Sequence, residues 1–315
     1  MSRSRRPALF LACAVLLLPE ARVDAASVAV ARPGAGTPDA ALARMVETER
    51  AFAALGLEKG VRESFLVYIA DDGIGFDNGP IPLKESMRAR PAGPEPYRLI
   101  WEPRYGDVAA SGEVGYLTGP YRVESRGSDG APVVRHGLFF SVWSKQADGE
   151  YRNVLDIGVR LKEAAEFAPG FRRAPHADRH AGGTREEARS SLIAAERALN
   201  EAARIGTLEA ALVGALDPDA RLHREGVAPA VGMAAARRLL AGAGRLAEAE
   251  SRFAGPSESG EFGWSYGRYG YAEAAGAAPA TAAPEHGSYA RVWTRDRKGA
   301  WRVVADIASP DREAR

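Results

Sequence analysis

The stretch "HGLFFSVWSKQADGEYRNVLDIG" (136–158) occurs a second time, in the same register, as "HGSYARVWTRDRKGAWRVVADIA" (286–308). Hydrophobic positions alone recur by chance, because every buried strand requires them. A histidine, a tryptophan, an arginine and an aspartate at fixed spacing indicate duplication instead. The identical pairs are His136/His286, Gly137/Gly287, Val142/Val292, Trp143/Trp293, Gly149/Gly299, Arg152/Arg302, Val154/Val304, Asp156/Asp306 and Ile157/Ile307.

Two further blocks repeat in the same order along the chain. "ASGEVGYLTGPY" (110–121) matches "ESGEFGWSYGRY" (258–269), and both contain the tripeptide Ser-Gly-Glu. "ETERAFAALGLEKGVRESFLVYIADDG" (47–73) matches "AAERALNEAARIGTLEAALVGALDPDA" (194–220). Three blocks in one order predict duplication of a whole domain.

Each copy has helical patterns first and strand patterns afterwards, which is typical of the α+β class. The first helix is predicted to follow the cap Thr37 and Pro38, and a second helix to span Val61 to Ile69. Long strands with turns at "SG" and "DG" come next. A sheet with helices on one face must curl around them, so we expect two cone-shaped domains with strongly curved antiparallel sheets. The apolar stripe of the first helix consists of Leu42, Met45, Val46, Glu49, Phe52 and Leu55.

The N-terminus has the pattern of a secretory signal peptide. Three arginines precede an apolar run from Ala8 to Leu18, and "VDAA" fits a cleavage site before Ala26. We therefore expect a signal peptide at 1–25 and an exported protein, periplasmic or secreted, by the general or the twin-arginine route. Further segments are predicted as a flexible N-terminus at 26–39, a first domain at 40–163, a linker at 164–184 and a second domain at 185–310.

The composition of the chain argues against nucleic acid, membrane and metal as binding partners. The chain has 42 basic and 41 acidic residues, so no net field favours nucleic acid, and we expect no nucleic-acid partner. After the signal, no stretch reaches the length of a membrane helix, so membrane insertion is not expected. Cys13, the single cysteine, lies within the signal, either lost with it or lipid-modified. His176 and His180 have the spacing of a helical metal site, but the flanking Pro and Gly favour a solvated linker, and no metal site is expected.

The order of helix, helix, "ADD" turn, short strand and a curved sheet ending in "VW…DG.YR.VLDIG" resembles the nuclear transport factor two-like superfamily, which includes ketosteroid isomerase and the SnoaL cyclases. Within it, the ending is most similar to the exported bacterial branch called domain of unknown function 4440. The resemblance covers residues 40–163 and, more loosely, 185–310. It implies the cone fold, but one scaffold of this kind supports many chemistries.

The resemblance places a candidate general base at Asp77, in "ADDGIGFD", where isomerase members carry a carboxylate. The alternative is that "FDNG" is a turn. The rest of the isomerase machinery is not matched, because its tyrosine and second acid would fall near Ala51 and Phe139. In the second copy Arg224 stands in the place of Asp77, so any catalysis is expected in the first copy.

The recurring aspartates are predicted to be buried, hydrogen-bonded anchors, for which Asp156→Asn would cost roughly 1 to 3 kcal/mol. We expect His136 and His286 on the neighbouring strand as their partners, either structurally or as an acid/base pair. His136 is therefore a second catalytic candidate, and Asp156 is also a candidate ligand-binding residue.

Aromatic side chains on the strands fill or line the predicted cones. Trp143 and Trp293 are expected in the cores, and Trp101 and Tyr116 are the candidates for lining a ligand pocket. No phosphate-binding glycine loop, serine nucleophile elbow or helical zinc motif is present in the sequence. No cofactor is expected.

We interpret the chain first as an exported protein that binds a small, mostly apolar molecule in the first cone. An isomerase, dehydratase or hydrolase that uses Asp77 without a cofactor is the second interpretation, and a non-catalytic scaffold with filled cones is the third. The duplication predicts an intramolecular pseudo-dimer of the two domains and a monomeric chain, since members of this superfamily commonly pair their sheets.

Overall fold

The computed structural model describes residues 37–175, 183–272 and 285–312. The expected signal peptide and the pair His176 and His180 lie outside these ranges. Within them, no helix has the length and hydropathy to cross a bilayer.

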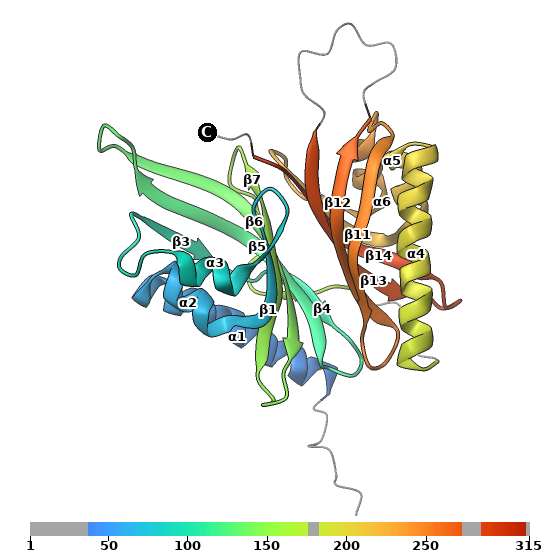
Figure 1. The fold of residues 1–315 in the computed structure, drawn as a ribbon, viewed down its shortest axis with the longest axis horizontal. Helices are drawn as coiled ribbons and strands as arrows, with labels where there is room; N and C mark the ends of the chain where they lie inside the picture. Colours follow the sequence, from blue (N-terminus) through green and yellow to red (C-terminus); the bar gives the residue numbers. More distant parts are fainter. Residues whose placement is uncertain (1–36, 176–182, 273–284, 313–315) are drawn as a thin grey trace, which may run out of the picture. The chain divides into compact units, whose positions relative to one another are not determined.

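The first copy packs three helices against a strongly curved sheet (Figure 1). Strands in the sheet follow the order β2-β1-β7-β6-β5-β4-β8, and β3 also pairs with β5. Most pairs are antiparallel, with β1–β7 and β4–β8 parallel. Its elements are α1 (Pro38–Lys59), α2 (Val61–Tyr68), β1 (Ile69–Phe76), β2 (Pro80–Pro82), α3 (Leu83–Ala89), β3 (Tyr97–Trp101), β4 (Tyr105–Val108), β5 (Val114–Arg126), β6 (Pro132–Lys145), β7 (Tyr151–Leu161) and β8 (Arg172–Arg173).

The second copy repeats this plan with a six-stranded sheet in the order β10-β9-β14-β13-β12-β11. Its two central hairpins pair in the same way as β5-β6-β7 of the first copy. The α+β class with two curved sheets is therefore confirmed. The elements are α4 (Arg185–Ile205), α5 (Leu208–Ala215), β9 (Leu216–Arg224), β10 (Ala230–Val231), α6 (Gly232–Leu240), β11 (Leu246–Pro256), β12 (Phe262–Tyr271), β13 (His286–Arg295) and β14 (Trp301–Pro310).

Local sequence accounts for the ends of the long helices. The Thr37 hydroxyl accepts the Ala40 N–H at 3.3 Å, Pro38 opens α1, and Gly60 ends it at a φ of 99°. Thr184 and Glu187 form a capping box at the start of α4. Helix α3 is not predicted by the sequence pattern, because seven residues without a side-chain cap give too short a periodic signal.

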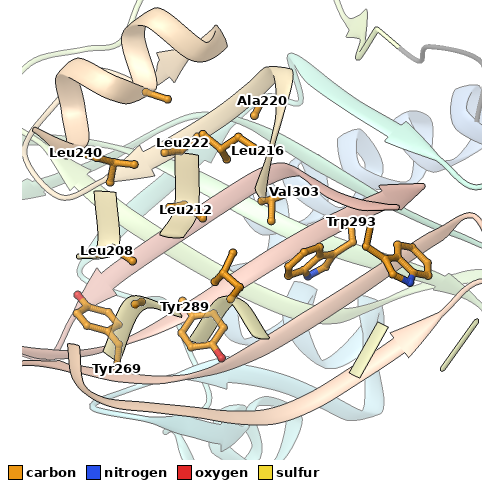
Figure 2. Packing of buried hydrophobic residues seen from close by; sticks show 14 of the residues in the cluster. Leu208, Leu212, Leu216, Ala220, Leu222, Leu240, Tyr269, Tyr289, Trp293 and Val303 are labelled. Atoms are coloured by element: carbon orange, nitrogen blue, oxygen red, sulfur yellow. The ribbon is translucent and has the colours of Figure 1, made fainter. Parts of the chain in front are cut away.

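Each cone has its own apolar core. Trp143 and Trp293 are almost fully buried, 0% and 1% exposed, which confirms their expected place in the interior. Figure 2 shows Tyr289 and Trp293 on one face of their strand, packed with leucines such as Leu212. The buried face of α1 carries the predicted stripe from Leu42 to Phe52, including the charged residue Glu49, whereas Leu55 is half-buried.

A third apolar cluster joins the outer faces of the two sheets, with Tyr116, Phe140 and Ile157 from the first copy and Phe262, Val292 and Ile307 from the second. Residues Ala35–Arg315 accordingly form one compact unit. Part of the expected linker contributes, since β8 pairs with β4 and Ala174 is buried.

The repeated Ser-Gly-Glu tripeptides meet in this contact reciprocally. The Glu113 carboxylate accepts the Glu258 N–H at 2.6 Å, and the Glu261 carboxylate accepts the Ala110 N–H at 2.7 Å. The hydroxyls of Ser111 and Ser259 lie 2.7 Å apart between them. This pairing gives the repeated tripeptide a structural role.

Candidate functional site

A cavity of about 240 Å³ opens between the helices and the sheet of the first copy. Its wall is aromatic and aliphatic, apart from the carboxyl group of Asp156 on β7 and the hydroxyl of Tyr121. The lining consists of Phe52 on α1, Phe65 on α2, Leu99 and Trp101 on β3, Tyr121 and Val123 on β5, Phe139 on β6, and Asp156, Ile157 and Gly158 on β7.

A second carboxyl group, that of Glu49, lies buried behind this wall. The indole N–H groups of Trp101 and Trp143 donate to its two oxygens at 2.7 and 2.8 Å, and the Ser141 hydroxyl donates at 2.7 Å. Burial raises the pKa of Glu49, and these three hydrogen bonds to the carboxylate oppose the rise. Three fixed donors hold the Glu49 side chain in one orientation.

The carboxyl group of Asp156 has fewer hydrogen-bond donors around it than that of Glu49. Among the residues that the structure describes, the Asp156 carboxyl group accepts one hydrogen bond, from the Asn153 amide at 3.2 Å, and the residue is half-buried. Desolvation raises the pKa of Asp156 to about 8, and the nearby Glu49 contributes because a second negative charge disfavours ionisation. At neutral pH the group is therefore mostly a neutral carboxylic acid, which is able to donate a hydrogen bond into the cavity.

The equivalent carboxyl groups of the second copy are neutralised by arginine. Arg291, which replaces Ser141, contacts Glu196 at 2.7 Å and Asp306 at 3.0 Å. Arg224 contacts the other oxygen of Asp306 at 2.5 Å. Burial would raise the pKa of Asp306, but the two guanidinium groups hold it below its ordinary value. The second cone thus carries a closed ionic cluster where the first has a free acid.

The two recurring aspartates, Asp156 and Asp306, therefore differ in whether a cationic side chain pairs with them. Asp306 is the buried, paired anchor that the sequence pattern predicts, and it is 1% exposed. Asp156 has no cationic partner in the described part of the chain, so the expected loss of stability in Asp156→Asn does not follow for this residue.

The prediction that His136 pairs with Asp156 and His286 with Asp306 is wrong. In the register of β6 and β7, His136 is opposite Leu161, whereas Ser141 is opposite Asp156. Five residues along a strand correspond to roughly 16 Å, which is too far for contact. His136 is half-buried near the strand end, and His286 lies 3.7 Å from Glu248.

Asp77 lies outside the cavity. It is exposed in the turn after β1, where its N–H donates to the Gly79 carbonyl at 2.8 Å, and Asn78 has a φ of 54°. Asp77 borders a different, polar pocket with Arg135 and Arg160. The geometry matches the turn that "FDNG" allows.

Of the two aromatic candidates, the cavity includes Trp101 but not Tyr116. Tyr116 is fully buried in the cluster between the sheets. Successive side chains of a strand point to opposite faces, so Tyr116 and Tyr121, five residues apart on β5, face different sides. Tyr121 is the residue that lines the cone.

The sequence-based candidates omit Glu49 and most of the apolar lining. Two signals pointed to Glu49: it interrupts the apolar stripe of α1, and it recurs as Glu196. A charged residue on the buried face of a helix needs partners, and indole donors provide them here. No group of residues suited to hold a metal ion occurs in the ranges that the structure covers.

No protein-family model matches the chain, and no curated protein matches it. Solved structures similar to part of it include a ketosteroid isomerase-like protein from Erwinia carotovora atroseptica, at 13% identity and a TM-score of 0.32, covering 39% of this chain and 97% of that one. The association domain of C. elegans CaMKII has 12% identity and a TM-score of 0.32, covering 38% of this chain and 96% of its own. An NTF2-like protein with a cystatin-like fold from Novosphingobium aromaticivorans has 14% identity and a TM-score of 0.30, covering 40% and 85%. Similarity at this level assigns no function.

Proposed function

We propose that the first copy binds a small, mostly apolar molecule in its cone, with the neutral carboxyl group of Asp156 donating a hydrogen bond to one polar group of that molecule. The observation that carries this proposal is a single carboxyl group, with its pKa raised to about 8, on a wall that is otherwise almost entirely apolar. Sites of this type combine apolar area with a few directed polar groups.

The size of the cavity restricts the ligand. At about 240 Å³ it is slightly smaller than the range of roughly 300 to 1,000 Å³ typical of small-molecule sites, which favours a compact ligand with one or two rings. The open cavity also favours binding over a scaffold with filled cones.

The proposal extends to the whole chain. The first copy supplies the pocket, and the second, whose polar centre is occupied by Arg291, supports it through the cluster between the sheets. The chain is then a monomeric pseudo-dimer of two nuclear transport factor two-like domains, exported to the periplasm or the medium. The reciprocal Ser-Gly-Glu contacts support this arrangement.

Binding is tested with a panel of compact neutral ketones, lactones and phenols, by ligand-observed NMR on the full chain. We expect Val123→Phe, which fills the cavity, to abolish binding. Asp156→Leu, which removes the hydrogen-bond donor, should weaken preferentially the ligands with an acceptor group. Val134→Phe, on an exposed side chain of β6, is the matched control and should bind normally. Equal binding by wild type and Val123→Phe would refute this site.

A cofactor-independent acid/base enzyme is the second candidate function. It is favoured by the raised pKa values of Asp156 and Glu49, two neighbouring carboxyl groups in an apolar cone. In this version Asp156 takes the role that the sequence assigned to Asp77. Proton abstraction by Asp156 predicts a rate that rises through about pH 8, is lost in Asp156→Asn and is kept in Asp77→Asn.

A further inference from the structure

Three aromatic side chains gather on the outer face of the second sheet, away from both cones. Phe253 on β11 lies 4.4 Å from Trp264 on β12 between ring centroids, and Trp264 lies 6.1 Å from Tyr266 with an interplanar angle of 18°. Phe253 and Tyr266 are also nearly parallel, at 17°. We call these three residues the outer aromatic cluster.

The equivalent positions of the first copy are covered by other parts of the chain. Tyr105 and Tyr116 correspond to Phe253 and Trp264, and Tyr116 is fully buried. The Arg221 guanidinium lies 4.3 Å from the Tyr105 ring centroid and 5.5 Å from that of Phe167, a residue that follows β7. Packing therefore explains the aromatic residues in the first copy.

The first copy covers only part of the outer aromatic cluster. Phe76 on β1 lies 5.9 Å from Tyr266 between ring centroids, and Trp264 and Tyr266 also pack against the apolar cluster between the sheets. Phe253 is 38% exposed, Trp264 and Tyr266 are half-buried, and all three line a hollow of about 490 Å³. This volume falls within the range typical of small-molecule sites. Aromatic area that faces a hollow in this way indicates an interaction site.

Charged and polar side chains border the same hollow. Asp72 and Glu113 are acidic, Lys145 and Arg185 are basic, and Gln146 adds an amide. The formal charges cancel, so the hollow favours a neutral ligand over an ion. These side chains nevertheless provide several hydrogen-bond donors and several acceptors around the hollow.

Glu113 provides a more specific signal. One of its carboxylate oxygens accepts the Glu258 N–H at 2.6 Å, which fixes the side chain. The other oxygen is buried and has no hydrogen-bond partner among the described residues. A buried, unpaired acceptor is unfavourable, and Glu113 lines the hollow, so a small shift of its side chain would let a hydroxyl donor from a ligand satisfy this oxygen.

We propose that this hollow binds a neutral saccharide. A pyranose ring has an apolar C–H face that packs on the electron-rich faces of aromatic rings, and a rim of hydroxyls that donate and accept hydrogen bonds. The outer aromatic cluster supplies the ring faces, Glu113 and Asp72 accept hydroxyl protons, and Arg185, Lys145 and Gln146 donate. This site is separate from the first cone and does not rest on the function proposed for it.

The test is retention of the labelled full chain on an array of immobilised microbial, plant and animal glycans. We expect one class of neutral glycans to be retained, and Trp264→Ala to raise the half-saturating concentration about tenfold or more, which corresponds to ~1.4 kcal/mol. Val123→Phe, which fills the first cone, should leave retention unchanged.

Two further variants keep the test decisive if Trp264→Ala does not fold. Trp264→Phe keeps an aromatic face and should retain the glycan more weakly, and Glu113→Gln keeps the bond to Glu258 but removes the charged acceptor and should also weaken retention. Absence of any retained glycan, or retention that none of the Trp264 and Glu113 variants alters, would overturn the proposal. A dimer in light scattering that Trp264→Ala makes monomeric would assign the cluster to self-association instead and would also overturn it.

Discussion

Replacement of Asp156 by Asn is expected to stabilise the protein at pH 8, although the equivalent change in the second copy should destabilise it. The folded pKa of Asp156 is about 8 against an ordinary value of 3.8, so the folded state binds the proton more tightly than the unfolded state. Stability from this group is therefore fully present below about pH 4 and is lost as the pH rises through 8.

The size of the effect follows from that difference. About four pKa units at ~1.4 kcal/mol each set an upper limit of roughly 6 kcal/mol. Water that reaches the half-buried side chain reduces this limit, so we expect a gain of roughly 2 to 4 kcal/mol for Asp156→Asn at pH 8. At pH 4 the difference should be within about 1 kcal/mol, because the asparagine still accepts the bond from Asn153.

The assay is urea unfolding followed by tryptophan fluorescence at pH 4, 6, 7 and 8. Asp306→Asn is the matched control, since it leaves Arg224 and Arg291 without their shared acid and should cost about 3 to 5 kcal/mol at pH 7. If Asp156→Asn lowers stability at pH 8, or leaves the pH dependence between 6 and 8 unchanged, Asp156 is not an unpaired acid in the folded protein.

Four further predictions address the other parts of the chain. His223 is buried, and its ring nitrogens have no hydrogen-bond partner among the described residues. Burial, together with the neighbouring Arg221 and Arg224, lowers the pKa of His223 to about 3. Because this folded pKa lies below the ordinary 6.5, stability should be lost as the pH falls from about 6.5 to 3, and His223→Leu should flatten that loss in acid unfolding curves. Arg291→Ser, which restores the first copy's residue, should cost about 3 to 5 kcal/mol in urea unfolding by leaving Glu196 and Asp306 less paired; an unchanged midpoint would show the ionic cluster to be dispensable. Glu261→Ala should destabilise by roughly 1 to 2 kcal/mol through the lost bond to Ala110, and a null result in the same assay would separate the Ser-Gly-Glu contact from stability. Residues 26–165 expressed alone should dimerise or aggregate in light scattering while the full chain stays monomeric, whereas a monomeric fragment as stable as the whole would mean that the copies are independent.

The sequence alone determined the architecture, because its signals are local or repetitive. Thr37 and Pro38 mark the start of α1, the period of the apolar stripe marks its buried face, and the repeated "VW" and "DI" strands mark both sheets. Duplication strengthened the inference, since a pattern seen twice in one register identifies the buried tryptophans without an alignment. The sequence also shows that a charged residue, Glu49, interrupts the apolar stripe of α1.

Tertiary structure decided which of these residues share a site. The register of β6 against β7 separates His136 from Asp156, and the alternation of β5 turns Tyr116 outward and Tyr121 inward. The contrast between Asp156 and Asp306 depends on two positions. Arg291 stands where the first copy has Ser141, and Arg224 stands where it has Asp77. A pKa is set by the groups that surround a carboxyl group in space, so identical aspartates in a repeated sequence became a free acid in one cone and a neutralised anchor in the other.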